Sequence, residues 1–297
     1  MSNLTQTFPI AVTEYTGTLP VINPTDPSLL LYLTPKGRSN DAVDRDQWVD
    51  YNNKYTAKLN NMYYSDRSGW LEDETGTSYL QLASGGILTV PNFYPFAEDP
   101  TRPSNLNSAM GKGMTIELDF KIDGITDYNA DLIKCISRDA NNTITVGFAI
   151  SGNKIRCYNS SKSGGDKGYL VNMNLTEGKR IRLSFVIEPN DARHDFPMCL
   201  TYLDGKISGA AIYSKKDNFI ESSDDKAQLI IDSKNAQISI YSIKFYTNAL
   251  GDNDILNNFT ASLSTLDERQ DRFDSNNVYN EEGLIDYEDI SAEHYDL

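Results

Sequence analysis

The sequence predicts an all-β sandwich, and three observations lead to this prediction. Short apolar or alternating segments recur along the chain, as in residues 114–124 (MTIELDFKIDG), where apolar and polar residues alternate. Clusters of Gly, Asn, Asp and Ser separate these segments and are typical of hairpin turns. Before residue 250 a helical period is almost absent, which excludes the crossover helices that a parallel sheet needs.

The expected strands can be read in order. The first, residues 29–35 (LLLYLTP), opens the apolar part of the chain. The others are residues 54–64, 78–83, 86–93, 114–122, 130–138, 144–152, 154–160, 179–189, 197–213, 227–233 and 236–247. Asp204-Gly205 lies inside one of these segments and predicts a turn there. Residues 163–168 (SGGDKG) are expected to form a hairpin tip.

The chain divides into three parts. Residues 1–28 contain four prolines and few apolar residues, which predicts an extended N-terminal arm. Residues 29–250 form the sandwich, and residues 251–297 form a helical, acidic C-terminal appendage. Within it, Asp252 or Asn253 is expected to cap a helix over 254–261, and a second helix is expected over 264–275.

Charge and cysteine content limit the partners and the compartment. The net charge is −15, and residues 267–297 alone hold eleven acidic residues against two arginines. This balance argues against nucleic acid or an anionic membrane as the main partner. Cys135, Cys157 and Cys199 lack CxxC spacing and are expected to be buried thiols. With a start that lacks the pattern of a signal peptide, they indicate a protein that folds in a cytoplasm.

Several segments carry a resemblance to a known superfamily. "LLLYLTPKGRSN", "YSDRSGWLEDETGTSYLQLASGGILTVP" and "MTIELDFKIDG" resemble the opening strands of concanavalin A-like jelly rolls, the lectin, laminin-G and glucanase superfamily. "KRIRLSFVIEP", "MCLTYLDGKISGAAIY" and "AQISIYSIKFYTNAL" resemble its later strands. The "GRSN" and "RFDSNNVY" segments are similar to the version of this domain in bacteriophage virion structural proteins. The resemblance implies a jelly-roll β-sandwich over roughly residues 30–250, but this fold carries many functions.

The strand at 114–124 raises the question of catalysis. In position it resembles the strand on which the glucanases of this superfamily keep a Glu-x-Asp-x-Glu row. This chain offers Glu117 and Asp119, but Lys121 stands where the third carboxylate would be. A cation beside a carboxylate lowers its pKa, whereas a general acid needs a raised pKa. We therefore expect no catalytic residues, and expect a polar face on which either Glu117 and Lys121 or charges on neighbouring strands form pairs.

Two other groups of residues are candidates for binding. Related jelly rolls often bind calcium through loop oxygens, so Asp127, Asn129 and Asp131 are weak calcium candidates, although hairpin turns need the same residue types. In "PNFYPF", Phe93, Tyr94 and Phe96 are candidates for a ligand or partner surface, because the prolines keep this segment off a central strand. Glu117, Asp119 and Lys121 are added to that surface as polar candidates.

The sequence favours a non-enzymatic bacteriophage virion structural protein, such as a tail, neck or fibre component assembled in the host cytoplasm. Its sandwich would mediate subunit assembly or bind a host-surface glycan. Its terminal segments would contact other virion proteins and favour a homo-oligomer. A free-standing carbohydrate-binding lectin is the alternative, and a glycoside hydrolase of the glucanase type is a second, less favoured one. The sequence predicts no cofactor, and calcium is the metal for which it offers candidate ligands.

Overall fold

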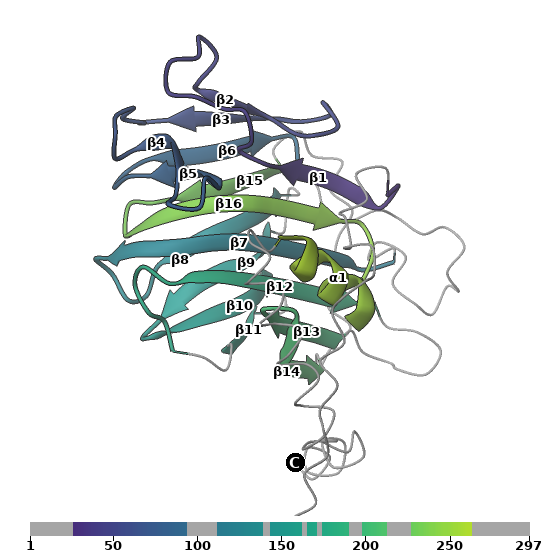
Figure 1. Cartoon of the computed structure of the whole chain (residues 1–297). Helices are drawn as coiled ribbons and strands as arrows, with labels where there is room; N and C mark the ends of the chain where they lie inside the picture. The colour runs from purple at the N-terminus through teal and green to yellow at the C-terminus, as the bar shows by residue number, and fades with distance from the viewer. Residues whose placement is uncertain are drawn as a thin grey trace, which may run out of the picture.

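The described part of the chain is a two-layer β-sandwich with one helix on an outer face (Figure 1). In this computed structural model, the described residues are 26–93, 112–138, 143–161, 165–170, 174–189, 198–212 and 227–262. All pairings between the strands of this part are antiparallel, in two sheets of eight strands each, called sheet A and sheet B below. The predicted fold class is therefore confirmed.

Sheet A carries the helix on its outer face. Its order is β14 (Lys206–Ile212), β13 (Met198–Leu203), β12 (Arg180–Glu188), β7 (Met114–Ile125), β16 (Ala236–Tyr246), β5 (Ser78–Leu82) and β4 (Gly69–Glu72). β1 (Leu29–Leu33) also pairs with β16, beyond the part of β16 that pairs with β5. β7 and β16, which are far apart in sequence, thus form the centre of the sheet.

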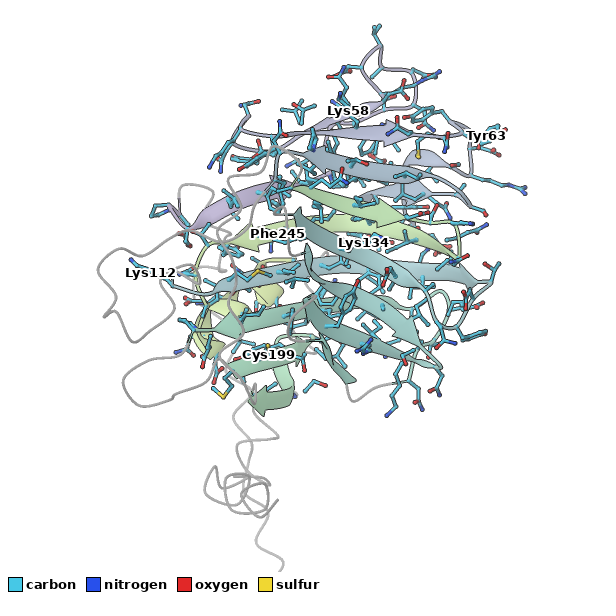
Figure 2. All side chains as sticks on the ribbon, turned by 180° about the vertical axis from the view of Figure 1, so that it is seen from behind. Lys58, Tyr63, Lys112, Lys134, Cys199 and Phe245 are labelled. Atoms are coloured by element: carbon cyan, nitrogen blue, oxygen red, sulfur yellow. The ribbon has the colours of Figure 1, made fainter. Side chains whose placement is uncertain are left out.

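Sheet B forms the opposite layer. Its order is β11 (Gly165–Leu170), β10 (Lys154–Ser161), β9 (Thr143–Ser151), β8 (Asp131–Arg138), β15 (Gln228–Asp232), β6 (Ile87–Pro91), β3 (Thr56–Asn60) and β2 (Gln47–Val49). Figure 2 shows this sheet from behind, with Lys58 on β3 and Lys134 on β8.

The main core lies between the two sheets. Along β7 the apolar residues Ile116, Leu118, Phe120 and Ile122 are all buried in it, as their alternation predicts. Aromatic rings add edge-on contacts, as between Phe93 and Phe245, whose ring centroids are 4.9 Å apart. The core therefore accounts for one face of each central strand and leaves the other face of β7 to its polar residues.

A β-bulge interrupts the alternation of β16. Ile240 and Ser242 pair with consecutive residues of β7, so Tyr241 is the extra residue. Ile240 and Ile243 on either side are both buried in the main core. Tyr241 and Ser242 consequently both lie on the outer face of sheet A, where a regular strand would place only one of them.

The helix α1 (Asp252–Ser262) covers part of this outer face and makes a second, smaller core. Ile255 is buried with Val186, Tyr202 and Tyr246 of sheet A. Acidic Asp252 and Asp254 stand in the first turn, where the helix dipole favours negative charge. In Figure 1 the helix lies over β16, β7 and β12.

The structure confirms most of the predicted elements and corrects one. The expected strands are present, as is the helix after Asp252. The short strands β2 and β4 were not predicted. The hairpin-tip prediction for 163–168 is wrong from Gly165 onward, because Gly165–Leu170 is β11 and pairs with β10 in regular register. The N-terminal arm up to residue 25 and the predicted second helix lie outside the described residues, and the three domain boundaries stay a prediction.

The three cysteines are buried thiols, as predicted: Cys135, Cys157 and Cys199 are between 0% and 4% exposed. Burial raises the pKa values of the Cys135 and Cys157 thiols well above their ordinary range. They pack as small apolar groups in the core. Among the described residues, no helix is long and apolar enough to cross a bilayer.

Candidate functional site

The helix α1 covers the part of the polar face of β7 that carries Glu117. Glu117 is 7% exposed, and Lys244 of β16 donates a 2.9 Å hydrogen bond to its Oε2. The amide Nδ2 of Asn258, on α1, lies 3.2 and 3.1 Å from the two carboxylate oxygens of Glu117. The same nitrogen is 3.0 Å from the hydroxyl of Tyr246. The helix is therefore attached to the sheet through a buried carboxylate.

Asp119 is the centre of a second buried ion pair. Arg180 of β12 donates to it through Nε (2.8 Å) and through its terminal nitrogen (2.7 Å), a two-pronged geometry. Arg182 Nε lies 3.5 Å from Asp119 Oδ2. Of the two predicted pairings, the cross-strand one is confirmed for Glu117, because Lys244 lies directly opposite it on β16. The pairing of Glu117 with Lys121 is wrong, since Lys121 lies 3.0 Å from Asp123 of its own strand.

A pocket opens beside these ion pairs, at the end of α1. Its volume is about 290 Å³. It is lined by the end of β1 and the residues after it, the β4–β5 turn, the bulge of β16, the Asp119–Arg180 pair and the last residues of α1. The lining residues are Tyr32, Thr34, Pro35, Lys36, Gly76, Thr77, Ser78, Asp119, Arg180, Tyr241, Ser242, Ala261 and Ser262. We call this the bulge pocket.

Aromatic rings give the bulge pocket its apolar surface. The Arg180 guanidinium lies 3.8 Å from the ring centroid of Tyr241, close enough for a cation–π contact. Burial raises the pKa of Tyr241 more than the positive charge of Arg180 lowers it, so the phenol stays neutral. Tyr32 stacks on Tyr51 with ring centroids 5.7 Å apart, and Tyr51 is 54% exposed.

The β4–β5 turn fixes another wall of the bulge pocket. Asp73 Oδ1 accepts hydrogen bonds from the backbone and hydroxyl of Thr75 (2.9 and 2.6 Å) and from the backbone of Thr77 (3.0 Å). Burial raises the pKa of Asp73, but these hydrogen bonds and the charge of Arg180 outweigh it, so the pKa is lowered. The carboxylate thus stays ionised and holds Thr77 at the pocket.

The candidates for a ligand or partner surface differ in where the structure places them. Phe93 is wrong as a surface residue, because it is 0% exposed and packs against Tyr55 and Phe245 in the core. Its backbone N–H donates a 3.0 Å hydrogen bond to the carbonyl of Ala227, just before β15. The ring of Phe93 therefore points into the core. Tyr94 and Phe96 lie outside the described residues. Of the polar candidates, Asp119 lines the bulge pocket, whereas Glu117 is enclosed under α1.

The three calcium candidates serve as turn and strand residues in the described structure. Asp127 Oδ1 accepts the backbone N–H of Asn129 (2.9 Å). Asp131 accepts a hydrogen bond from the hydroxyl of Tyr158 (2.9 Å) and lies 3.5 Å from Lys134. Within the described ranges, acidic, histidine and cysteine side chains do not gather in threes as a metal site needs. Calcium binding stays a prediction without structural support.

The "GRSN" segment has a structural role. Arg38 donates to the side chain and backbone of Asp44 (3.1 and 2.8 Å) and to the backbone of Gln47. Asn40 donates to the backbone of Ser65 (2.8 Å) and accepts the N–H of Trp70 (2.7 Å). These contacts fasten the loop after β1 to the start of β4.

Sequence reasoning missed most of the bulge pocket, although the sequence contains one signal for it. In "ISIYSIKF" the apolar alternation changes phase between Ile240 and Ile243, and an inserted polar residue there indicates a bulge. The Asp119–Arg180 pair could not be read from the sequence, because it depends on which strand lies beside β7.

Comparison with solved structures finds similar all-β folds. The receptor-binding domain of botulinum neurotoxin D is 12% identical with a TM-score of 0.50, over 78% of this chain and 52% of that chain. The binding domain of Paraclostridial Mosquitocidal Protein 1 is 12% identical with a TM-score of 0.51, over the same shares. The chain thus spans about half the length of both structures. No protein-family model and no curated protein sequence matches it.

At these identities the likeness shows the fold alone, an all-β sandwich. This agrees with the superfamily resemblance of the sequence in its coarser form. The phage resemblance has no counterpart in these comparisons.

Proposed function

We propose that this chain is a non-enzymatic binding module of a bacteriophage virion, and that its sandwich binds a cell-surface glycan. The observation that carries the glycan part is the bulge pocket. Sugar-binding sites combine aromatic surface with a few well-placed polar groups, and this pocket offers Tyr32 beside several hydroxyl groups. Its volume of about 290 Å³ suits a single sugar ring.

The buried ion pairs support a non-enzymatic role. A retaining glycosidase needs two carboxyl groups about 5–5.5 Å apart, one of them able to donate a proton. Here Glu117 is bonded to Lys244 and Asn258 under α1, and Asp119 is bonded to Arg180. Both carboxylates are thus engaged as acceptors, which suits structural support better than proton transfer.

The glycan part is tested by applying the purified full chain to a glycan array, with two matched variants. Ala261→Trp adds bulk to a residue that lines the bulge pocket, whereas Asn257→Trp adds it to an exposed position one turn earlier on α1. We expect binding that is lost in Ala261→Trp and kept in Asn257→Trp. Absence of binding by the unaltered chain at micromolar concentration overturns the glycan part.

The non-enzymatic part is tested separately by incubating the full chain with polysaccharides and measuring new reducing ends. We expect none above the buffer control. Cleavage that disappears in Glu117→Gln, with folding retained by circular dichroism, would establish a hydrolase and overturn the proposal.

The virion part rests on the sequence resemblance of "GRSN" and "RFDSNNVY" and predicts self-assembly. Light scattering of the full chain over a wide concentration range measures it, and a defined oligomer is expected. A chain that stays monomeric and binds no virion component contradicts the assembly role and favours a free-standing lectin. Any shortened version should end after residue 262, since removing α1 would uncover Glu117.

A further inference from the structure

We propose that the bulge pocket selects an uncharged sugar ring and rejects carboxylated or sulfated ones. This inference rests on the glycan binding proposed above and names the class of sugar. It follows from the pairing of the charged groups around the pocket and from the hydroxyl groups on its walls. Lys36, which lines the pocket, gives a way to test it.

Asp119 and Arg180, the charged side chains at the floor of the pocket, are bonded to each other. The Nε edge of Arg180, the edge best shaped to hold a carboxylate, is already bonded to Asp119 at 2.8 and 2.7 Å. Arg182 adds its charge to the same carboxylate from 3.5 Å. An anionic sugar would have to displace Asp119, and the displaced carboxylate is only 5% exposed. Removing one partner of a buried ion pair is costly, so the exchange is unfavourable.

The lysines on the strands near the pocket are also paired with carboxylates. Lys244 is bonded to Glu117 and Lys121 to Asp123, at 2.9 and 3.0 Å. Asp73, in the turn that forms one wall, is held ionised by its hydrogen bonds and by Arg180. Both lysines are thus already engaged by carboxylates of β7.

The remaining polar groups on the pocket walls are hydroxyls. They belong to Thr34, Thr77, Ser78, Ser242 and Ser262. A hydroxyl both donates and accepts a hydrogen bond, and so do the hydroxyls of a neutral sugar. Tyr32, backed by its stack on Tyr51, gives an apolar wall for the C–H face of the ring. The walls thus match a ring that carries many hydroxyls and no charge.

Among the described residues that line the pocket, Lys36 is the exposed cation. The binding of an acidic ligand would depend on the charge of Lys36, whereas the binding of a neutral ring would not depend on that charge. Lys58, exposed on the opposite sheet, is its matched control (Figure 2).

The experiment applies the full chain to a glycan array of neutral and acidic glycans at 50 mM and 500 mM NaCl, with Lys36→Gln, Lys58→Gln and Ala261→Trp alongside. We expect neutral glycans to bind, with an apparent affinity that changes less than about twofold with salt. Lys58→Gln should bind neutral glycans like the unaltered chain, Ala261→Trp should lose binding, and Lys36→Gln reports whether acidic glycans depend on this cation.

Three results would overturn the inference. Binding confined to acidic glycans, weakened by salt and by Lys36→Gln, leaves glycan binding intact but assigns the wrong class of sugar. If the Ala261→Trp variant still binds neutral glycans as well as the helix control Asn257→Trp does, the glycan site lies outside the bulge pocket. Absence of any binding by the unaltered chain removes both this inference and the glycan-binding proposal.

Discussion

Asn258 of α1 and Glu117 of β7, separated by 141 positions in sequence, share two contacts of 3.2 and 3.1 Å between one amide nitrogen and both carboxylate oxygens. The amide also reaches the hydroxyl of Tyr246 at 3.0 Å. Because the last residues of α1 line the bulge pocket, this contact links the position of the pocket wall to the buried ion pair.

Asn258→Leu should destabilise the chain by about 1.5–3 kcal/mol, since it removes hydrogen bonds to a buried charged group. Urea unfolding, followed by tryptophan fluorescence, measures the change. Asn257→Leu, at an exposed position of the same helix, should stay within about 0.5 kcal/mol of the unaltered chain. Equal effects of the two substitutions would show that the amide of Asn258 contributes little.

The Lys244–Glu117 pair should show strong coupling. Lys244→Met leaves the Glu117 carboxylate buried without its cation, and we expect a loss of about 3–5 kcal/mol. The double variant Lys244→Met with Glu117→Leu should recover much of that loss, because an apolar pair of similar size avoids the buried charge. Chemical denaturation of all four members of the cycle gives the coupling energy, and additive effects would contradict a direct interaction.

Alkaline conditions should destabilise the fold through its buried tyrosines. Burial and the charge of Glu117 raise the pKa of Tyr246 above its ordinary value of about 10. Above pH 10 the unfolded chain loses this proton while the folded chain retains it, so the stabilising contribution falls as pH rises. Thermal melts between pH 8 and 11 should show a falling Tm above pH 10. In Tyr246→Phe the fall should be shallower, and an identical profile would assign the effect to other groups.

The Asp204-Gly205 turn should tolerate no side chain at its glycine. Gly205 has φ of +75°, and an added Cβ would lie 3.0 Å from three atoms of the Phe259 side chain. Gly152 has φ of +60° and nothing within 4 Å of such a Cβ. Gly205→Ala should therefore cost more stability than Gly152→Ala, which pays for backbone strain alone. Comparable unfolding midpoints would show that Phe259 moves aside freely.

The sequence predicted the strands well because one face of each strand is apolar and the period of two is local information. It predicted α1 because Asp252 and Asn253 are suited to cap a helix, and a cap is also local information. Short strands such as β2 and β4 escaped, because three or four residues hold too few alternations. The glycines of residues 163–168 predict a hairpin tip, yet pairing with β10 makes the part from Gly165 onward a strand.

The candidate site was less predictable because its charges meet across strands. Glu117 and Lys121 looked like partners on one strand, but Lys244 and Asp123 take those roles. The order of strands β12, β7 and β16 sets these distances, and nothing in the local sequence specifies that order. Phe93 illustrates the converse, since prolines nearby suggested exposure while the end of β6 directs it into the core.

The extra residue at Tyr241 divides β16 into two halves with independent neighbours. The half before it pairs with β5, and the half after it pairs with β1, along the same side of the strand. A relative with one residue fewer between Ile240 and Ile243 would keep both halves in place and lose one residue of the bulge pocket. Chain length at this point is therefore a marker by which relatives that keep the pocket can be told from those that have lost it.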